Sequence, residues 1–283
     1  MNILLTGSGG FIGKNIKNSI NNKYNLLTPR SYELNLCDKT AVNNYFSDNK
    51  IDFIIHCAST GGAKGIDDPV DTIETNVSMV NNLLKYKNDS TKVMLFGSGA
   101  MYNKSRNLHK VKESEIGKYI PKDLYGQSKV KISEITRSRD DVLCLNIFGC
   151  YGYGEKESRF PSYAVNQNLN HQTIFINQNV VFDYLFVEDM VKIVEYFIEN
   201  QWQDSVINIT PQISVSLLEI AQTVNEISDF KSEIIVKNPV MNYEYTGDNS
   251  LLMKNIPSFS FTDIKDGIKK LYDYNRNFVA IMS

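Results

Sequence analysis

The sequence predicts an α/β protein built on a doubly wound parallel sheet. In the first half of the chain, short apolar runs alternate with segments whose apolar residues recur every three or four positions. This alternation is typical of βαβ units, in which a helix carries the chain from one parallel strand to the next. A glycine-rich turn after the first apolar run and a change of pattern after residue 150 support the same fold class.

The strands and helices of the first half can be assigned in order. The apolar runs end at polar or glycine-rich turns, as buried parallel strands do. The expected strands are Asn2 to Thr6, Asn25 to Thr28, Asp52 to Cys57, Lys92 to Gly97 and Val142 to Ile147. The expected amphipathic helices between them are Phe11 to Ile20, Lys39 to Phe46, Asp71 to Tyr86 and Leu124 to Thr136.

The pattern becomes less regular after residue 150. A stretch rich in polar, glycine and aromatic residues is followed by isolated helices and strands. The later elements include Met190 to Ile198, Ser216 to Ile227, Ser232 to Lys237 and Phe261 to Tyr274. We therefore expect a larger domain over residues 1–150 and a smaller α/β region over residues 151–283 that interleaves with it.

Composition and charge exclude several classes of partner. The 283 residues are 42% hydrophobic, which is enough for a sizeable core. The chain has 30 Lys and Arg residues and 32 Asp and Glu residues, which gives a net charge of −2. This balance provides no excess of positive charge for binding nucleic acid or an anionic membrane. The apolar start stops at Gly7, too soon for a signal peptide or a membrane span, so a cytoplasmic location is expected.

The cysteines and histidines do not predict a metal site. The four cysteines have no C-x-x-C spacing, so neither a disulfide framework nor a zinc site is expected. The three histidines are also too scattered along the chain to suggest a shared metal ion. His56 ends a strand, and a packed or hydrogen-bonded role is expected for it.

A glycine motif predicts a dinucleotide site. Gly7, Gly10 and Gly13 follow the first strand and open the first helix with the spacing G-x-x-G-x-x-G. Such glycines allow a tight turn, and they let a pyrophosphate approach the positive end of the helix. The strand before and the helix after supply the context that the motif requires. Residues 1–150 are therefore expected to be a Rossmann-type NAD(P)-binding domain.

The end of the second strand favours NADP(H) over NAD(H). An acidic residue there binds the ribose 2′-hydroxyl of NAD, whereas an arginine accommodates the 2′-phosphate of NADP. The sequence has Arg30 and Ser31 at this place and no acid before Glu33. A guanidinium and a hydroxyl suit a phosphate.

Ser98, Tyr125 and Lys129 are the candidate catalytic residues. Tyr125 and Lys129 are four residues apart, so they share one face of the predicted helix. Ser98 leaves the carboxyl end of the fourth strand, the edge at which open α/β sheets bind ligands. A neighbouring ammonium favours the phenolate form of tyrosine, which makes Tyr125 a candidate acid or base at a carbinol or ketone oxygen. Ser98 would hydrogen-bond the same oxygen, and Lys129 would also hold the nicotinamide ribose.

These residues resemble the extended short-chain dehydrogenase/reductase family of nucleotide-sugar epimerases, dehydratases and reductases. The segment from Pro29 to Asp38 and the Gly61-Gly62 pair are most similar to reductases of the GDP-L-fucose synthase type. The matching segments are Gly7 to Gly13, Ile54 to Ala58, Thr75 to Val77, Ser98 to Tyr102, Tyr125 to Lys129 and Tyr184 to Asp189.

The resemblance implies hydride transfer to or from a nucleotide sugar, with Ser98, Tyr125 and Lys129 in catalysis. It also implies a homodimer that pairs through the helices beginning at Asp71 and Leu124. The cofactor residues that it implies are Gly7, Gly9, Gly10, Phe11, Ile12, Gly13, Arg30, Ser31, Asn35, Leu36, Cys57, Ala58, Ser59, Asn76, Tyr125 and Lys129.

Departures from the family pattern narrow the range of reactions that the resemblance implies. Gly99 and Ala100 follow Ser98 where dehydratases carry acids, so water elimination is disfavoured. Ala100 and Arg159 stand where fucose synthases have a proton-moving Cys and His, which disfavours epimerisation at C3 and C5. Phe182 and Gly149 replace an Arg and an Asn of the relatives. The pattern therefore also allows a substrate that lacks the usual nucleotide. The candidate substrate residues are Lys64, Gly99, Ala100, Asn146, Arg159 and Phe182.

The leading hypothesis is an NADP(H)-dependent reductase of a nucleotide-linked keto sugar, acting in the supply of surface-polysaccharide precursors. The first alternative is a redox-neutral 4-epimerase that retains its cofactor, because the same three residues would serve it. The second is a non-catalytic NAD(P)-binding sensor or scaffold.

Overall fold

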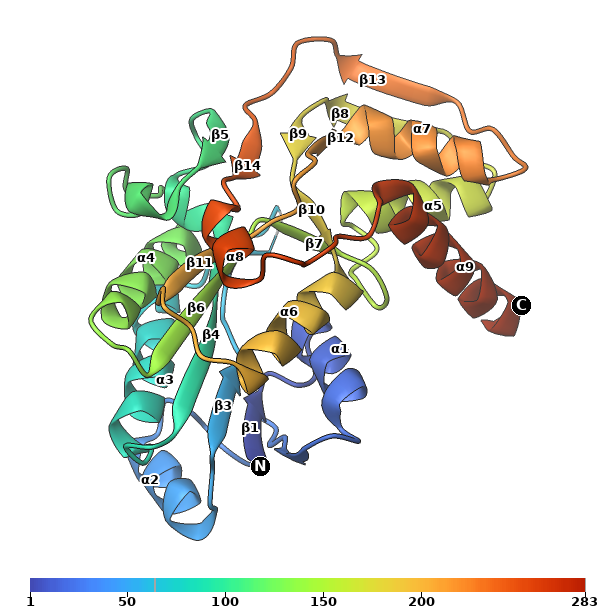
Figure 1. Ribbon diagram of the computed structural model, residues 1–283. Helices are drawn as coiled ribbons and strands as arrows, with labels where there is room; N and C mark the ends of the chain where they lie inside the picture. The colour runs from blue at the N-terminus through green and yellow to red at the C-terminus, as the bar shows by residue number, and fades with distance from the viewer. Residues whose placement is uncertain (64, 283) are drawn as a thin grey trace.

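The computed structural model describes residues 1–63 and 65–282, with side chains described as far as residue 277. A six-stranded parallel sheet lies at its centre, with the strand order β11-β6-β4-β3-β1-β2 (Figure 1). The strands are β1 (Asn2–Thr6), β2 (Asn25–Leu27), β3 (Phe53–His56), β4 (Lys92–Ser98), β6 (Val142–Ile147) and β11 (Val206–Ile209). The chain changes direction across the sheet between β1 and β3, and ligands bind at such a switch point in doubly wound sheets.

Helices cover both faces of this sheet. On one face lie α1 (Phe11–Ile20) and α6 (Val187–Glu199), and on the other lie α2 (Lys39–Asp48), α3 (Thr72–Tyr86) and α4 (Leu124–Arg137) (Figure 1). A separate hydrophobic core lies on each face of the sheet, and alternate residues of β1 belong to one core or the other. Ile3 and Leu5 pack with α1 and α6, whereas Leu4 packs with α2 and α3. Both faces of a parallel strand are buried, which explains why the strand sequence is continuously apolar.

The sixth strand, β11, is absent from the sequence-based assignment. It returns from beyond residue 150 and pairs in parallel with β6, with Val206 beside Cys144. Its four residues lie in the region where the hydrophobic pattern is irregular, so periodicity alone gives little signal for it. The second half of the chain therefore completes the central sheet as well as forming the smaller region.

The smaller region lies beyond the carboxyl ends of the central strands. Its helices are α5 (Phe160–Leu169), α7 (Leu217–Ile227), α8 (Ser250–Asn255) and α9 (Ile264–Met282). Its sheets pair β10 (Tyr184–Phe186) with β7 (Gly149–Tyr151) and β13 (Ile234–Asn238) with β8 (Ile174–Gln178). A four-stranded sheet has the order β12 (Val215–Ser216), β9 (Val181–Phe182), β14 (Tyr245–Gly247) and β5 (Leu108–Val111). Two 3₁₀ turns, η1 (Gly99–Tyr102) and η2 (Glu113–Glu115), complete the elements.

The last helix begins three residues later than the sequence predicts. The rings of Phe259 and Phe261 pack edge to face, 5.0 Å apart. The backbone N–H of Thr262 donates to Asp189 at 2.6 Å. These contacts hold the segment before α9 in a non-helical conformation, so the helix starts at Ile264. None of the helices in the described ranges is long and apolar enough to cross a membrane.

Candidate active site

The turn between β1 and α1 requires glycine at two positions. Gly7 has a φ of +69°, and a Cβ there would lie 2.5 Å from the backbone nitrogen of Ala58. A Cβ at Gly13 would lie 2.3 Å from the Gly7 carbonyl oxygen. Both side chains would push α1 away from the sheet. The free N–H groups at the start of α1 therefore remain close to the switch point, where they suit an anion.

A cavity of about 680 Å³ opens beside this turn. It is formed by the segments that follow β1, β2 and β3, with α3 as a further wall. Its volume is in the range of small-ligand and cofactor sites. The predicted cofactor residues that line it are Gly7, Gly9, Gly10, Arg30, Ser31, Asn35, Leu36 and Ala58. Cys37, Thr75 and Met79 also line the cavity and were not among the predicted cofactor residues, although Cys37 and Thr75 lie in segments that carry the resemblance.

Arg30 brings a positive charge to this cavity. A Cβ at Gly9 would lie 2.2 Å from Nη1 of Arg30, so the guanidinium rests against the glycine turn. Glu33 points back to the backbone, where its carboxylate accepts a hydrogen bond from the Arg30 N–H at 2.6 Å. Of the described residues that line the cavity, none carries a carboxylate. The glycine turn and the cationic wall fit the pyrophosphate and ribose of a dinucleotide.

Other predicted cofactor residues do not line the cavity. Phe11 and Ile12 pack against the hydrophobic core beneath α1. Burial raises the pKa of the Cys57 thiol, and the backbone N–H of Cys57 donates to Thr6. Ser59 is exposed in the loop after β3.

Asn76 connects two parts of the site from within the protein. Its side chain is 1% exposed. Its amide oxygen accepts from the Thr60 N–H at 2.8 Å, and its amide nitrogen donates to Ser128 Oγ at 3.0 Å. Ser128 in turn donates to the carbonyl oxygen of Tyr125 at 2.7 Å. Asn76 therefore ties the loop after β3 to the helix that carries Tyr125.

Lys129 lies beside Tyr125 in a buried position. Its side chain extends from α4 towards β4, and Nζ donates to the Phe96 carbonyl oxygen at 2.8 Å. Nζ is also 5.3 Å from the centroid of the Tyr125 ring. Burial and the charge of Lys129 lower the pKa of His56 to about 3, so this imidazole is neutral and hydrogen-bonded to Thr6 at 2.7 Å. The packed, hydrogen-bonded role expected for His56 is confirmed.

Ser98 is the last residue of β4, at the carboxyl edge of the sheet. Its Oγ accepts a hydrogen bond from the Ala100 N–H at 3.2 Å and thereby caps η1. Gly99 and Ala100 follow it in the same turn and are buried. The neighbours of Ser98 in this turn therefore bring no carboxylate.

Asp68 holds the loop that covers Tyr125. One carboxylate oxygen accepts from the Gly62 N–H and the other from the Tyr125 N–H, both at 2.7 Å. Gly62 has a φ of +75°, and a Cβ there would lie 3.0 Å from the Tyr125 ring. The loop backbone thus packs directly on the phenol. The Gly61-Gly62 pair was the available sequence signal for this contact, but Asp68 carried none.

The predicted substrate residues occupy different environments. Phe182 lies in a group of aromatic rings above η1, 5.2 Å from the ring of Tyr245. Arg159 is exposed at the start of α5, and its charge partly opposes the effect of burial, which raises the pKa of Tyr184. Desolvation raises the pKa of Glu155 in the same segment to about 8, although Ser162 donates to it at 2.8 Å. Lys64 lies outside the described residues.

Asn146 requires a correction. Its side chain is fully buried, and its amide donates to Asn208 at 3.1 Å. A Cβ at Gly97 would lie 2.0 Å from Asn146 Oδ1, so the amide sits beneath β4. Asn146 therefore supports the strand that ends at Ser98 and does not reach a substrate. Its position at the end of β6 suggested a ligand contact, but alternation along the strand turns it into the core.

Comparison with known proteins identifies the family. Residues 3–210 match the NAD dependent epimerase/dehydratase family. The chain belongs to this family. GDP-L-colitose synthase from Yersinia pseudotuberculosis is 26% identical over 98% of this chain and 98% of its own length. GDP-L-fucose synthase from Escherichia coli (strain K12) is 24% identical over 82% of this chain and 83% of its own.

Solved structures show the same fold. A GDP-mannoheptose C4 reductase from Campylobacter jejuni with NADP bound superposes with a TM-score of 0.82 at 18% identity, covering 97% of this chain and 98% of that one. Membership of the family makes the protein an NAD(P)-dependent enzyme. The hypothesis of a non-catalytic binding module is therefore not retained.

Proposed function

We propose that the protein is an NADP(H)-dependent reductase of a nucleotide-linked keto sugar, acting at C4 in the supply of surface-polysaccharide precursors. One observation carries the proposal: the Lys129 ammonium lies 5.3 Å from the centroid of the Tyr125 ring and donates to Phe96, on the strand that ends at Ser98. The names of the relatives support the substrate class, because they describe enzymes of GDP-linked sugars.

The three side chains have complementary tasks at the carbonyl group. When bound, the reduced nicotinamide supplies the hydride that adds to the carbonyl carbon. Ser98 donates a hydrogen bond to the carbonyl oxygen and polarises it. Tyr125 transfers its proton to the same oxygen, which yields the alcohol. Lys129 stabilises the phenolate that remains, since its ammonium is held 5.3 Å from the ring by the Phe96 carbonyl.

Arg30 and Ser31 support the preference for NADP(H). Both line the cavity, and the Arg30 guanidinium lies at the edge of the glycine turn. A 2′-phosphate there would accept charge-assisted hydrogen bonds from the guanidinium. Glu33, the nearest acid along the chain, is occupied by the backbone of its own turn.

A reduction is favoured over water elimination by the turn that follows Ser98. Gly99 and Ala100 have no group that moves a proton, and both are buried. A redox-neutral 4-epimerase is the second candidate, because Ser98, Tyr125 and Lys129 suit it equally and the family includes epimerases.

The decisive experiment follows NADPH oxidation by the purified protein with freshly prepared GDP-, CDP-, UDP- and dTDP-linked 4-keto sugars, with NADH in parallel. We expect stoichiometric NADPH consumption with one of them and slower consumption of NADH. Interconversion of C4 epimers without net consumption would replace the reductase by the epimerase. Demonstrable cofactor binding without either reaction would remove both candidates.

A further inference from the structure

Side chains fix both polar backbone groups of Tyr125. Its N–H donates to the Asp68 carboxylate at 2.7 Å, and its carbonyl oxygen accepts from Ser128 at 2.7 Å. Ser128 in turn accepts from the Asn76 amide at 3.0 Å. Asp68 lies before α3 and Asn76 lies within it, so the segment that follows β3 holds the start of α4 at two points.

Asp68 completes the start of α4. The first N–H groups of a helix have no partner within the helix. Asp123, the N-cap residue, accepts from the Gly126 N–H at 2.8 Å. The Tyr125 N–H, one residue earlier, donates to Asp68 instead. A carboxylate at this end of a helix is also favoured by the helix dipole. The first turn of α4, which carries Tyr125, is therefore fixed by two carboxylates.

The other carboxylate oxygen of Asp68 fixes the surface on which the phenol rests. It accepts from the Gly62 N–H at 2.7 Å. Gly61 and Gly62 have φ values of +84° and +75°, so the loop turns towards both the carboxylate and the ring. A Cβ at Gly61 would lie 2.7 Å from the Asp68 carboxylate, and a Cβ at Gly62 would lie 3.0 Å from the Tyr125 ring. One side chain thus holds the backbone of Tyr125 and the loop packed on its ring.

We propose that Asp68 is a positioning residue that holds the Tyr125 phenol where it meets the carbonyl oxygen of the substrate. The inference rests on the proposed reductase function, in which Tyr125 transfers a proton to that oxygen. The rate of such a step depends steeply on geometry, and a misplacement of about 1 Å can cost about 100-fold. Asp68 itself takes no part in the proton transfer and acts through Tyr125.

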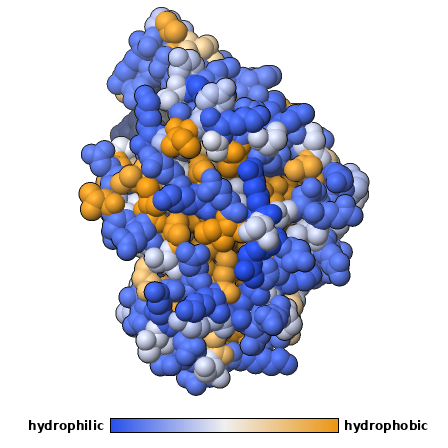
Figure 2. Space-filling view, turned by 90° about the vertical axis from the view of Figure 1, so that its left-hand side faces the viewer, coloured by the Kyte–Doolittle hydropathy of each residue, from blue (hydrophilic) through white to orange (hydrophobic). Residues whose placement is uncertain are grey.

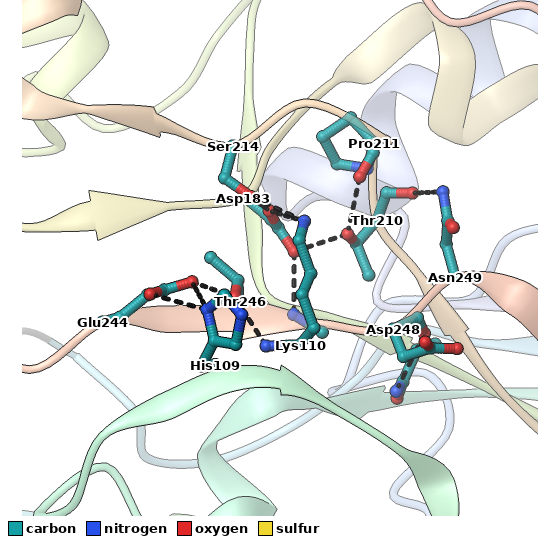
Figure 3. A network of polar contacts seen from close by, with 12 residues as sticks. His109, Lys110, Asp183, Thr210, Pro211, Ser214, Glu244, Thr246, Asp248 and Asn249 are labelled. Carbon is teal, nitrogen blue, oxygen red and sulfur yellow. Dashed lines mark hydrogen bonds and ion pairs between the residues drawn. The ribbon is translucent and has the colours of Figure 1, made fainter.

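Asp183 illustrates a carboxylate that supports the fold alone (Figure 3). It is fully buried and accepts from Thr210, from Ser214 and from the Gly247 N–H, with the Lys110 ammonium 3.3 Å away. These contacts join β5 and β14 to the segments around β9 and β12. None of these four partners is a candidate catalytic residue. Asp68 differs, because one of its two partners is Tyr125.

The kinetic test compares Asp68→Ala with Asp68→Asn. Asp68→Ala leaves both N–H groups without their acceptor, so we expect kcat to fall about 10- to 100-fold with KM little changed. Asp68→Asn offers one acceptor oxygen to the two N–H groups, so its kcat should lie between those of the wild type and Asp68→Ala. In a Tyr125→Phe background, Asp68→Ala should cause no further loss. An unchanged kcat in Asp68→Ala, or independent losses in the double variant, would overturn the inference.

Two control variants separate positioning from stability. Asp67→Ala changes the exposed neighbour in the same loop and should leave kcat unchanged. Ser214→Ala removes one donor to Asp183, so it should lower the melting temperature while kcat stays close to that of the wild type. A loss of kcat in Ser214→Ala as large as that in Asp68→Ala would assign both losses to stability and contradict the positioning role.

Hydrogen exchange of backbone amides tests the bridge without turnover. In ¹⁵N-labelled protein followed by NMR, we expect the Gly62 and Tyr125 amides to exchange faster in Asp68→Ala than in the wild type. Both amides should keep the wild-type rate in Asp67→Ala. Equal exchange in the wild type and Asp68→Ala would contradict the inference whether or not a substrate is known. Failure of the wild type to reduce any keto sugar, by contrast, contradicts the proposed function alone.

Discussion

Among single residues, Lys129 sets the charge around the reacting groups. The residue is 5% exposed, and its ammonium donates to a carbonyl oxygen, that of Phe96, instead of to a carboxylate. A carbonyl oxygen carries no full negative charge, so the positive charge acts on the imidazole of His56, and the ammonium lies 5.3 Å from the Tyr125 ring. Burial and this cation together keep His56 neutral, and in the proposed mechanism the same cation would stabilise the Tyr125 phenolate.

Tyr125→Phe tests the assignment of the proton donor. We expect kcat to fall by about 10²- to 10⁴-fold, the usual contribution of a positioned acid or base. NADPH affinity should change little, because the ring still packs on Gly62. Stopped-flow NADPH oxidation and a fluorescence titration measure the two quantities. Tyr243→Phe, at an exposed tyrosine, is the control, and turnover close to wild type in Tyr125→Phe would refute the assignment.

Arg30→Ala tests the basis of cofactor preference. Loss of the charge-assisted contact to the 2′-phosphate should weaken NADPH binding about 10- to 100-fold, whereas NADH binding should stay within about twofold. Arg30→Lys retains the charge but lacks the planar fork of the guanidinium, so its affinity for NADPH should lie between those of the wild type and Arg30→Ala. Dissociation constants from fluorescence titration provide the comparison. An equal loss for both cofactors would mean that Arg30 supports the turn but does not recognise the phosphate.

At the scale of elements, the segment between β7 and α5 contains a carboxyl group that is poorly solvated. Desolvation raises the pKa of Glu155 from 4.5 to about 8, and the charge of Arg159 opposes this shift only in part. Between pH 4.5 and about pH 8, Glu155 is therefore protonated in the folded protein and ionised in the unfolded chain. Its contribution to the free energy of unfolding is fully present below pH 4.5 and is lost as the pH rises towards about 8.

Glu155→Gln should remove this pH dependence. The amide oxygen still accepts from Ser162, and no charge develops. We expect the melting temperature of the wild type to fall more between about pH 5 and about pH 9 than that of the variant. Differential scanning fluorimetry at matched ionic strength measures the melting temperature at each pH. Glu157→Gln, at an exposed position in the same segment, is the control. Parallel curves for the wild type and Glu155→Gln would show that Glu155 is ionised in the folded state at neutral pH.

The accuracy of sequence-based prediction differed between kinds of element. The first helix was predicted to the residue, Phe11–Ile20, because strand, glycine turn and apolar periodicity all lie within a few positions. The contact of Tyr125 with Asp68 was not predictable, because it joins residues far apart in the chain. Asn146 was assigned to substrate because its strand end is at the site, but the side chain faces Asn208 in the core.

At the scale of the whole molecule, apolar side chains gather in the middle of the face that α3 and α4 line (Figure 2). Ile73, Val77 and Leu84 recur on one side of α3 and are half-buried. Val70 and Ile120, at the approaches to the two helices, are 95% and 62% exposed. Contiguous apolar surface of this kind marks association sites in soluble proteins. We propose that two copies of the chain pair through these helices.

The dimer makes a prediction for the mass in solution. Light scattering coupled to size exclusion should give twice the 32.2 kDa of one chain. Val70→Glu introduces a charge that a self-complementary interface would bring close to its own copy, so the dimer should dissociate. Because Val70 is almost fully exposed in the single chain, the variant should keep its melting temperature at high dilution and its NADPH affinity. Val240→Glu, exposed on the β13–β14 connection, should leave the dimer intact. A monomeric wild type at micromolar concentration, or equal effects of the two variants, would assign this face to another partner.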